Sequence, residues 1–329
     1  RTLLASHFRD REIVLVDDRS EDGTRELAHA LAERSGGAVR VVDGEPLPDG
    51  WVGKPWACWQ GYRAACGELL LFTDADTRHG PDLLGHAVGA LEAERADFLS
   101  VLPYQRMKTF WERVVLPMIG LVIRLRYPRL ERVNRNRDPA RTFANGQFIL
   151  VRREAYEAVG GHEAVRGEIV EDVGLAQRFV AAGRRVFMAH AERLMETRMY
   201  RSLAGIVEGW SKNLALGSRL VAPPALRPAM PWIAVAGLVL VWIAPPVALA
   251  ASILAGPGPL RTWAIGATAA SVLYWAGVYL VHRESWLYAL LYPLGAGVAA
   301  WLFVRSARLG ERVEWKGRRY GRGGEVVTG

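Results

Sequence analysis

The last third of the chain contains three long apolar stretches, at residues 232–254, 262–281 and 286–304. Each is close to the ~20 residues that an α-helix needs to cross the hydrocarbon core of a bilayer. The rest of the chain has the mixed character of a globular domain, and the whole is 329 residues long, 50% apolar and 23% charged. The sequence therefore predicts a domain outside the membrane that is followed by a membrane domain.

Strand-like runs alternate with helical patterns in the first hundred or so residues. The strands are expected at 11–18, 38–44, 68–76 and 96–104, and the helices at 23–34, 55–66 and 81–94. This alternation predicts an α/β fold, Rossmann-like, with a mostly parallel sheet and helices on both faces. Such sheets bind ligands at the carboxyl ends of their strands. Four acidic residues lie at the carboxyl ends of two of these strands and are expected at that edge: Asp17, Asp18, Asp74 and Asp76.

The stretch 109–127 is apolar but contains Arg113, Arg124 and Arg126. It is too short and too charged to cross a bilayer. We expect a helix that lies in the membrane interface, and a buried core helix is the alternative.

The net charge of +8 raises the question of an acidic partner. The arginines are scattered through the chain and then concentrate in the tail after the last apolar stretch. An anionic lipid surface is therefore a better match than nucleic acid, which we do not expect to bind. The two cysteines, Cys58 and Cys66, have no metal-ligand or redox spacing and are predicted to be packing residues.

The segment LLLFTDADT reads as a buried strand that ends in two carboxylates one residue apart, Asp74 and Asp76. These charges repel each other unless a cation lies between them, and Mg²⁺ or Mn²⁺ would remove the repulsion while binding phosphates. A solvated loop with two acids is the alternative. A phosphatase-type aspartate motif is excluded, because it requires Thr or Val where Arg78 stands.

Two other segments suggest a nucleotide pocket. VDDRSEDGT carries Asp17 and Asp18, one of which could accept from a base N–H or a ribose hydroxyl, although turn and N-cap roles are the ordinary alternative. In GWVGKPWACWQG, Lys54 precedes Pro55, a residue suited to the start of a helix. Lys54 and the free backbone N–H groups would then face a phosphate, whereas a plain surface lysine is the alternative.

A pair of acids, Glu171 and Asp172, begins an amphipathic helix in RGEIVEDVGLAQRFVAAG. Acids in a first turn are stabilised by the helix dipole, which is one explanation. The other is a general base that takes a proton from an acceptor hydroxyl. A helix at 198–213 carries Trp210 and Lys212, which could cover a pyrophosphate or anchor the chain at the membrane surface.

Four motifs in this order, EIVLVDDRSEDGT, TDAD, ANGQFILVRREAYEAVGGHE and VEDVGLAQR, resemble the inverting family-2 glycosyltransferases of GT-A fold. GWVGKPWACWQG, RMYRSLAGIVEGWSKNL and RVEWKGRRY are similar to a membrane-bound subgroup, the bacterial carotenoid-type (diaponeurosporenoate) glycosyltransferases, with hopanoid-associated glycosyltransferases as near relatives. The resemblance covers nearly the whole chain and departs from the family in two ways. The family's opening strand is missing, so an N-terminal truncation is expected. EGWSKN replaces the Q-x-x-R-W signature of processive synthases.

The resemblance implies a nucleotide-diphosphate sugar as donor, most often a UDP-sugar, with Mg²⁺ or Mn²⁺ and inversion at the anomeric carbon. It implies that Asp18 binds the nucleobase, that Asp74 and Asp76 bind the ribose and the metal-bound diphosphate, and that Asp172 is the base. The further site residues expected are Glu171 beside the base, Asp17, Lys54, Trp210 and Lys212 on the donor side, and Gly146 and Gln147 on the acceptor side.

From these features we expect a catalytic domain at 1–220, a membrane domain of two to three helices at 228–305 and a basic tail at 306–329. The expected enzyme moves one sugar to a lipid such as a carotenoid, a hopanoid or another terpenoid. It would be a multi-pass protein of the bacterial inner membrane with a cytoplasmic catalytic domain. The alternatives are a polyprenyl-phosphate or polysaccharide-type glycosyltransferase and a non-catalytic nucleotide-sugar-binding membrane protein.

The charges conflict with three full crossings, which would place the Arg- and Lys-rich tail outside, against the preference of such residues for the cytoplasm. Pro245 and Pro246 lie in the first stretch and should interrupt its helix. We therefore expect 232–254 to be re-entrant or partly inserted. The stretches 262–281 and 286–304 would form a spanning hairpin, and the tail would return to the cytoplasm.

Overall fold

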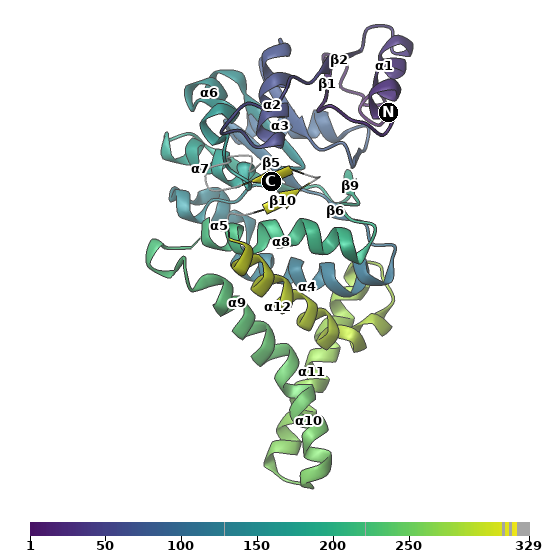
Figure 1. Cartoon of the computed structure of the whole chain (residues 1–329), viewed down its shortest axis with the longest axis vertical. Coiled ribbons are helices and arrows are strands. Elements are labelled where there is room, and N and C mark those ends of the chain that lie inside the picture. Colours follow the sequence, from purple (N-terminus) through teal and green to yellow (C-terminus); the bar gives the residue numbers. More distant parts are fainter. Residues whose placement is uncertain (128, 221, 311–312, 316–317, 321–329) are drawn as a thin grey trace. The chain divides into compact units, whose positions relative to one another are not determined.

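The computed structural model describes residues 1–127, 129–220, 222–310, 313–315 and 318–320 (Figure 1). The chain divides into two compact units. Unit 1 consists of Arg1–Arg106, Arg129–Met199 and Glu311–Gly329, and unit 2 of Met107–Pro128 and Tyr200–Gly310. The predicted functional division at residues 220 and 306 stays a prediction.

The strands of unit 1 confirm the predicted β segments and add several shorter ones. They are β1 (Ile13–Asp17), β2 (Val39–Asp43), β3 (Leu69–Thr73), β4 (Thr77–His79), β5 (Phe98–Leu102), β6 (Tyr104–Gln105), β7 (Phe148–Arg152), β8 (Val186–His190), β9 (Met195–Thr197), β10 (Val313–Trp315) and β11 (Arg318–Tyr320). β1 pairs with β2 in parallel, and β10 pairs with β11 in an antiparallel ladder. The other strands form one sheet in the order β3-β7-β5-β8 and another in the order β4-β9-β6.

In the four-stranded sheet β3, β5 and β8 run in one direction, and β7 lies antiparallel between β3 and β5. The predicted α/β class is confirmed, and most strands of this sheet share a direction as expected. The sheet is nevertheless mixed, because β7 enters it after a long excursion through unit 2 rather than through a right-handed βαβ crossover.

Helices cover both faces of this sheet, as predicted. Those of unit 1 are α1 (Thr24–Arg34), α2 (Gly53–Ala64), α3 (Leu83–Ala93), α5 (Leu130–Arg135), η1 (Pro139–Arg141), α6 (Arg153–Ala158), η2 (Gly161–Val165) and α7 (Glu171–Ala181). Alternate residues of β5 face opposite ways: Phe98 packs in a cluster with Phe179 of α7, whereas Leu99 packs with Leu91 of α3. This period of two buries both faces of the sheet.

The antiparallel pairing of β7 positions the candidate site. Thr73, the last residue of β3, pairs with Phe148, the first residue of β7. The segment that leads into β7 therefore lies at the carboxyl end of β3. There the backbone N–H of Asp74 donates to the carbonyl of Gln147 at 3.4 Å.

Unit 2 is helical over its described residues. It contains α4 (Phe110–Arg126), α8 (Leu203–Leu220), η3 (Pro224–Leu226), α9 (Met230–Leu238), η4 (Val239–Ile243), α10 (Ala244–Ala255), α11 (Pro259–Val281), η5 (Trp286–Leu291) and α12 (Tyr292–Leu309).

Helix α4 begins at a capping box. The Thr109 side chain accepts from the backbone N–H of Glu112, and the Glu112 carboxylate accepts from the Thr109 N–H at 2.6 Å. One face of α4 is fully buried, including Val115 and Ile119. Burial within unit 2 supports the core-helix alternative for this segment, whereas its predicted position in the membrane interface stays a prediction.

The apolar stretches form three helices that are long and apolar enough to cross a membrane, Met230–Leu254, Pro259–Val281 and Trp286–Leu309. Pro245 and Pro246 do not interrupt the first of them, which was expected to break. The π-helical segment η4 directly precedes the prolines, and its wider turn accommodates residues that cannot donate a backbone hydrogen bond.

Figure 1 shows α10 and α11 side by side, joined by the short turn before Pro259, so the antiparallel partner of α11 is α10. Helix α11 also packs against η5, at the start of the third apolar segment, so the predicted spanning hairpin of 262–281 with 286–304 stays a prediction.

Candidate active site

Lys54 joins three segments that are far apart in the sequence. Its Nζ lies 2.9 Å from Asp74 Oδ1, at the end of β3, and 2.9 Å from Glu171 Oε1, at the start of α7. It also donates to the carbonyl of Gly146, before β7, at 3.2 Å. Of the predicted site residues, Lys54, Asp74, Glu171, Asp172 and Gly146 are thus brought together at one place in unit 1.

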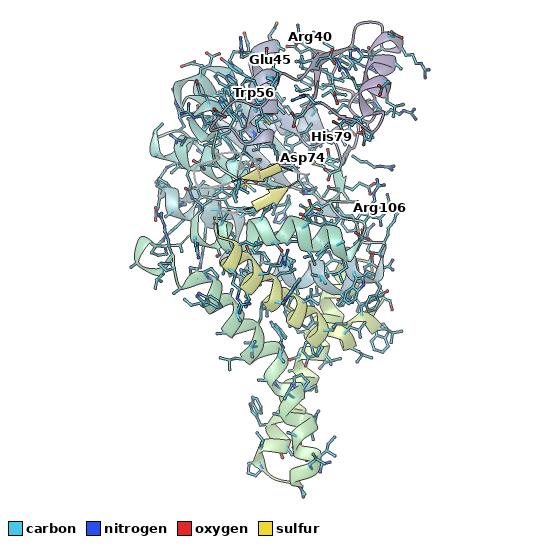
Figure 2. All side chains as sticks on the ribbon, viewed as in Figure 1. Arg40, Glu45, Trp56, Asp74, His79 and Arg106 are labelled. Atoms are coloured by element: carbon cyan, nitrogen blue, oxygen red, sulfur yellow. The ribbon has the colours of Figure 1, made fainter. Side chains whose placement is uncertain are left out.

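The start of α2 fixes the position of this lysine. Val52 is extended, and its N–H donates to the carbonyl of Arg166 at 2.7 Å. One turn later, the Trp56 indole donates to the carbonyl of Glu45 at 3.1 Å, and Figure 2 labels both residues close together. Pro55 lies in the first turn, where its missing N–H costs no helical hydrogen bond.

The charges around Lys54 determine its protonation. Burial by itself would lower the pKa of the amine, but Glu171, Asp74 and Asp172 outweigh burial and hold this pKa well above its usual value. The lysine is therefore a permanent cation beside the acids at neutral pH. The Lys54 side chain is 41% exposed, so it lies at the surface of unit 1 while paired with two acids, and its predicted contact with a phosphate stays a prediction.

Asp172 is oriented by two backbone donors. Its Oδ2 accepts from the N–H of Gly146 at 2.7 Å, and its Oδ1 accepts from the N–H of Val173 at 2.8 Å. Burial, followed by the negative charge of Glu171, raises the pKa of Asp172 to about 6. A carboxylate with this pKa is ionised at pH 7 and basic enough to take a proton, which is the requirement for a general base.

Gly146 is required by close packing. A Cβ at this position would lie 2.7 Å from Lys54 Nζ and 3.1 Å from Asp172 Oδ2. Any side chain would therefore displace the lysine or the candidate base. The glycine of ANGQF lets the backbone approach both charges at hydrogen-bond distance.

We expect Gly146→Ala to lower turnover by about 10²-fold, because misplacement of a catalytic group by an ångström has an effect of this size. The fold should survive, since the added methyl group meets side chains that can move. Steady-state kinetics and a thermal melt on the same preparation measure the two effects. Gly85→Ala on α3, where a Cβ would meet nothing within 4 Å, is the matched control. If Gly146→Ala kept the wild-type turnover, the close contact of the residue 146 backbone with Lys54 and Asp172 would be unimportant for catalysis.

The turn that carries Asp74 and Asp76 is held by a small polar network. Thr73 Oγ1 lies 3.2 Å from Thr77 Oγ1 and 3.1 Å from His79 Nε2, and Thr77 Oγ1 donates to the carbonyl of Asp74. Burial lowers the pKa of His79 to about 4, so the ring is neutral at pH 7. Figure 2 labels Asp74 and His79 near each other. The sequence interpretation missed this network. Its visible signal in the sequence was a Thr on each side of the acid pair.

The Gln147 side chain forms hydrogen bonds with three other side chains of unit 1. The side chain is buried, and its Oε1 accepts from Gln105 and from Asn145 at 3.2 Å each, while its Nε2 donates to Thr197 at the same distance. Asn145 in turn donates to the carbonyl of Val101 at 3.1 Å. These bonds join the segment before β7 to β6 and β9. The predicted acceptor-side role of Gln147 stays a prediction, as does that of Gly146.

Asp17, the last residue of β1, is buried and only 3% exposed. Its Oδ2 accepts from the N–H of Ser20 at 3.2 Å, and its Oδ1 has no partner within the described part of the chain. Asp18 is only partly buried. A buried carboxylate oxygen without a donor is costly, so this atom suits a ligand N–H.

Trp210 and Lys212 lie on α8 in unit 2, where the Trp210 ring is 6.3 Å from that of Tyr200. Both residues belong to unit 2, and their predicted contact with the donor stays a prediction. The Arg-rich tail, including Arg312, Lys316 and Arg322, lies outside the residues whose side chains are described.

The predicted divalent cation can be tested against the residues at the β3–β4 turn. No group of three or more His, Cys, Asp or Glu side chains that could hold a metal occurs among the described residues. Asp74 and Asp76 offer two carboxylates, and Mg²⁺ is commonly bound by one or two carboxylates together with substrate phosphates and water. The acid pair fits a cation that binds with the donor, rather than a preformed metal cage.

The sequence is similar to a protein-family model and to enzymes of known name. Residues 1–160 match the model described as Glycosyl transferase family 2. A relative in Staphylococcus aureus (strain MRSA252), 4,4'-diaponeurosporenoate glycosyltransferase, is 28% identical over 94% of this chain and 80% of its own length.

Two solved structures of glucosyl-3-phosphoglycerate synthase from Mycobacterium tuberculosis are more distant. The complex with phosphoglyceric acid is 19% identical, with a TM-score of 0.41 over 68% of this chain and 75% of that one. The complex with Mn²⁺, UDP-glucose and phosphoglyceric acid is 16% identical, with a TM-score of 0.38 over 64% and 69%. Likenesses this distant support no conclusion about ligands.

The family match and the relative agree with the family predicted from the motifs. The chain is therefore a glycosyltransferase whose residues 1–160 match the model described as Glycosyl transferase family 2.

Proposed function

We propose that this glycosyltransferase moves a single sugar from a nucleotide-diphosphate donor to a hydroxyl or carboxyl group of a membrane lipid, with inversion at the anomeric carbon. The observation that carries the proposal is the placement of Asp172, which two backbone N–H groups orient beside Lys54, the partner of Asp74. A base and a phosphate-binding turn at one site are what a single-displacement transfer needs.

In the proposed reaction, Asp172 takes the proton of an acceptor hydroxyl while the acceptor oxygen forms its bond to the anomeric carbon. An acceptor carboxylate attacks without this proton transfer. The bond between that carbon and the diphosphate oxygen breaks from the opposite face, and the nucleoside diphosphate leaves with its negative charge. Lys54 provides a fixed positive charge at the site. Asp74 and Asp76 would hold the cation, which supplies Lewis-acid stabilisation of the leaving diphosphate when bound.

The donor site includes Asp17 in this proposal. Its unpartnered Oδ1 is suited to accept from a nucleobase N–H, and this favours Asp17 over Asp18, which the family resemblance suggested for that role. Uracil carries such an N–H group, so UDP, the donor nucleotide that the family resemblance implies, fits this role.

Asp17→Asn should weaken UDP binding about tenfold, since it replaces a charged acceptor by a neutral one, a difference on the order of 1.4 kcal/mol. Asp18→Asn should change binding much less. Calorimetric titration with UDP, without any acceptor, measures both. Equal losses in the two variants, or a larger loss in Asp18→Asn, would assign the nucleobase to the other acid.

The lipid acceptor is supported by two observations. The chain carries three helices that are long and apolar enough to cross a membrane, which supports a position at a bilayer, where apolar acceptors dissolve. The relative from S. aureus is named for 4,4'-diaponeurosporenoate, and we extend that class of acceptor, a carotenoid-like molecule, to this chain. We place the protein in the bacterial inner membrane with unit 1 in the cytoplasm, where nucleotide sugars are made.

Mass spectrometry of lipids tests the function. Cells that express the full chain should contain a lipid that has gained one sugar, and cells that express Asp172→Asn at the same level should lack it. A product that releases the sugar in mild acid would indicate a polyprenyl-phosphate acceptor instead. A protein that binds UDP-sugar but yields no glycolipid in either strain would be a non-catalytic binder.

A further inference from the structure

Helix α4 cannot cross a membrane, for a topological reason. The chain enters it from Arg106 of unit 1 and returns to unit 1 at Arg129. The strands before and after it pair with each other, since Phe98 of β5 is opposite Val151 of β7. A crossing helix would put these two strands on opposite sides of the bilayer. Both ends of α4 therefore lie on the side of unit 1.

Helix α12 is held along its length by helices that do not cross. At its N-terminal end, Gly295 lies so close to α4 that a Cβ there would collide with the carbonyl of Val114. At its C-terminal end, Ser306 accepts from the N–H of Ala215 at 2.9 Å, and Arg305 donates to Ser211 at 3.2 Å.

Ala215 and Ser211 belong to α8, which follows unit 1 directly. Helix α8 contains three charged residues and is not among the candidate spans found in the described chain. Both ends of α12 are thus bound to helices on the side of unit 1. The apolar composition of α12 marks it as a possible span, but it is also what burial between helices requires. In the segment Trp286–Leu309, 44% of the most apolar 18-residue stretch is buried inside the structure.

The C-terminal end of α11 also lies on that side. The guanidinium of Arg113, in the first turn of α4, is 2.7 Å from the Glu284 carboxylate, just after α11. The hydroxyl of Tyr279 donates to the Arg113 carbonyl at 2.8 Å. The Arg113–Glu284 pair is largely shielded from solvent, so this connection is a built contact rather than a loose surface pair.

The helix pair Met230–Leu254 and Pro259–Val281, which we call the hairpin, contacts α12 through α9 and η4, but its helices are less buried than α12. Only 11% and 22% of the most apolar windows of these helices are buried. Large apolar side chains are exposed along both, among them Leu240, Leu254, Ile265 and Leu273. In Figure 1, α10 and the first turns of α11 extend away from α4, α8 and α12. With 25 and 23 residues, the helices are about 37 and 34 Å long, against a hydrocarbon core of about 30 Å.

The charges on the two ends of the hairpin agree with an insertion from one side. The turn at its tip and the residues next to it carry a single charge, Arg261. Near its other end lie Arg219 and Arg227 before the first helix and Arg283 after the second. Arginines next to membrane spans favour the cytoplasmic side. Trp232 and Trp263 are exposed near opposite ends, where interfacial aromatic residues are expected.

We propose that the membrane is crossed twice, by the two helices of the hairpin, and that α12 does not cross. The lipid hydrocarbon covers the exposed apolar side chains of the hairpin, and the chain at Gly310 lies on the same side as unit 1. This topology resolves the conflict between three apolar stretches and a basic tail without a re-entrant first helix. It does not depend on the reaction proposed above.

Labelling of single cysteines tests the proposal in the full chain. Of the native cysteines, Cys66 is exposed, unlike the packing residue predicted, and with Cys58→Ala it serves as the marker for unit 1. In a background of Cys58→Ala and Cys66→Ser, three variants report on the tip, the base and the end of α12: Pro257→Cys, Ser285→Cys and Arg308→Cys. All three positions are exposed. The probe is a membrane-impermeant maleimide applied to bacterial spheroplasts before and after permeabilisation, and labelling in denaturant measures the amount of each variant.

The proposal expects Pro257→Cys to react in intact spheroplasts, and Cys66, Ser285→Cys and Arg308→Cys to react only after permeabilisation. Reaction of Arg308→Cys together with Pro257→Cys before permeabilisation would mean three full crossings. Reaction of Ser285→Cys alone would mean that α11 and α12 form the spanning pair. A tip that is protected until permeabilisation would mean that the hairpin does not cross. Each of these three results overturns the proposal.

Discussion

Replacement of Asp172 by Asn should lower turnover with an acceptor hydroxyl by about 10²-fold or more, the usual contribution of a general base. Asparagine can still accept from the N–H of Gly146 but cannot take a proton from the acceptor, so the geometry of the site should persist. Donor affinity should stay nearly unchanged. Turnover with saturating donor and calorimetry with UDP measure the two quantities.

Glu171→Gln is the matched comparison, because Glu171 precedes Asp172 and is bound to Lys54 rather than to backbone donors. A large loss in Glu171→Gln with little loss in Asp172→Asn would show that the neighbouring acid is the base. If neither change matters, the two acids only stabilise the start of α7.

The pH profile gives an independent signature of the same base. Asp172 acts only when it is ionised, and its pKa is raised to about 6, so the rate should fall as the pH drops through about 6. An unperturbed Asp would lose activity only near pH 4. Residual activity of Asp172→Asn should lack this decline. A wild-type rate that is constant from pH 7 to pH 5 would contradict the assignment.

Activity should also require a divalent cation, and Asp76→Ala should lower it by at least about 10²-fold, the effect of losing one group that stabilises developing charge. Asp74 and Asp76 are the two carboxylates of the β3–β4 turn, so removal of one of them should weaken binding of the cation. The measurements are turnover in chelator, turnover after Mn²⁺ is restored, and the rise in melting temperature when Mn²⁺ and UDP are added together. Asp76→Ala should lose that rise.

The control for this loss is Glu92→Ala, which removes an exposed acid from α3. It should keep both the activity and the stabilisation by Mn²⁺ with UDP. Full wild-type activity in chelator would remove the metal from the proposal, and Lys54 would then be the main cation near Asp74.

Local patterns in the sequence determined the elements of this fold. The apolar runs of β1, β3 and β5 and the helical periods between them depend on residues within one element, so they could be recognised without a partner. The positions of Asp74 and Asp76 at a strand end and of Asp172 in a first helical turn followed from the same local reasoning. The motifs around them also indicated the family.

The contacts that turn these residues into a site were decided by tertiary structure. Lys54 meets Asp74 and Glu171 only because α2, β3 and α7 pack around one sheet. The need for glycine at position 146 comes from the approach of two side chains that are remote in the sequence. His79, next to Thr73 and Thr77, is a further case. Its ring is neutral because it is buried, and burial cannot be read from the neighbouring sequence.

The membrane part shows the same division. Hydropathy found all three apolar helices, because apolar composition is a property of each segment alone. It could not tell a helix that faces lipid from one that is packed between α4 and α8, because both environments favour the same side chains. Pro245 and Pro246 likewise predicted a break, but the wider turn of η4 accommodates them and the helix continues. Composition thus sets which segments avoid water, whereas only packing decides whether protein or lipid replaces it.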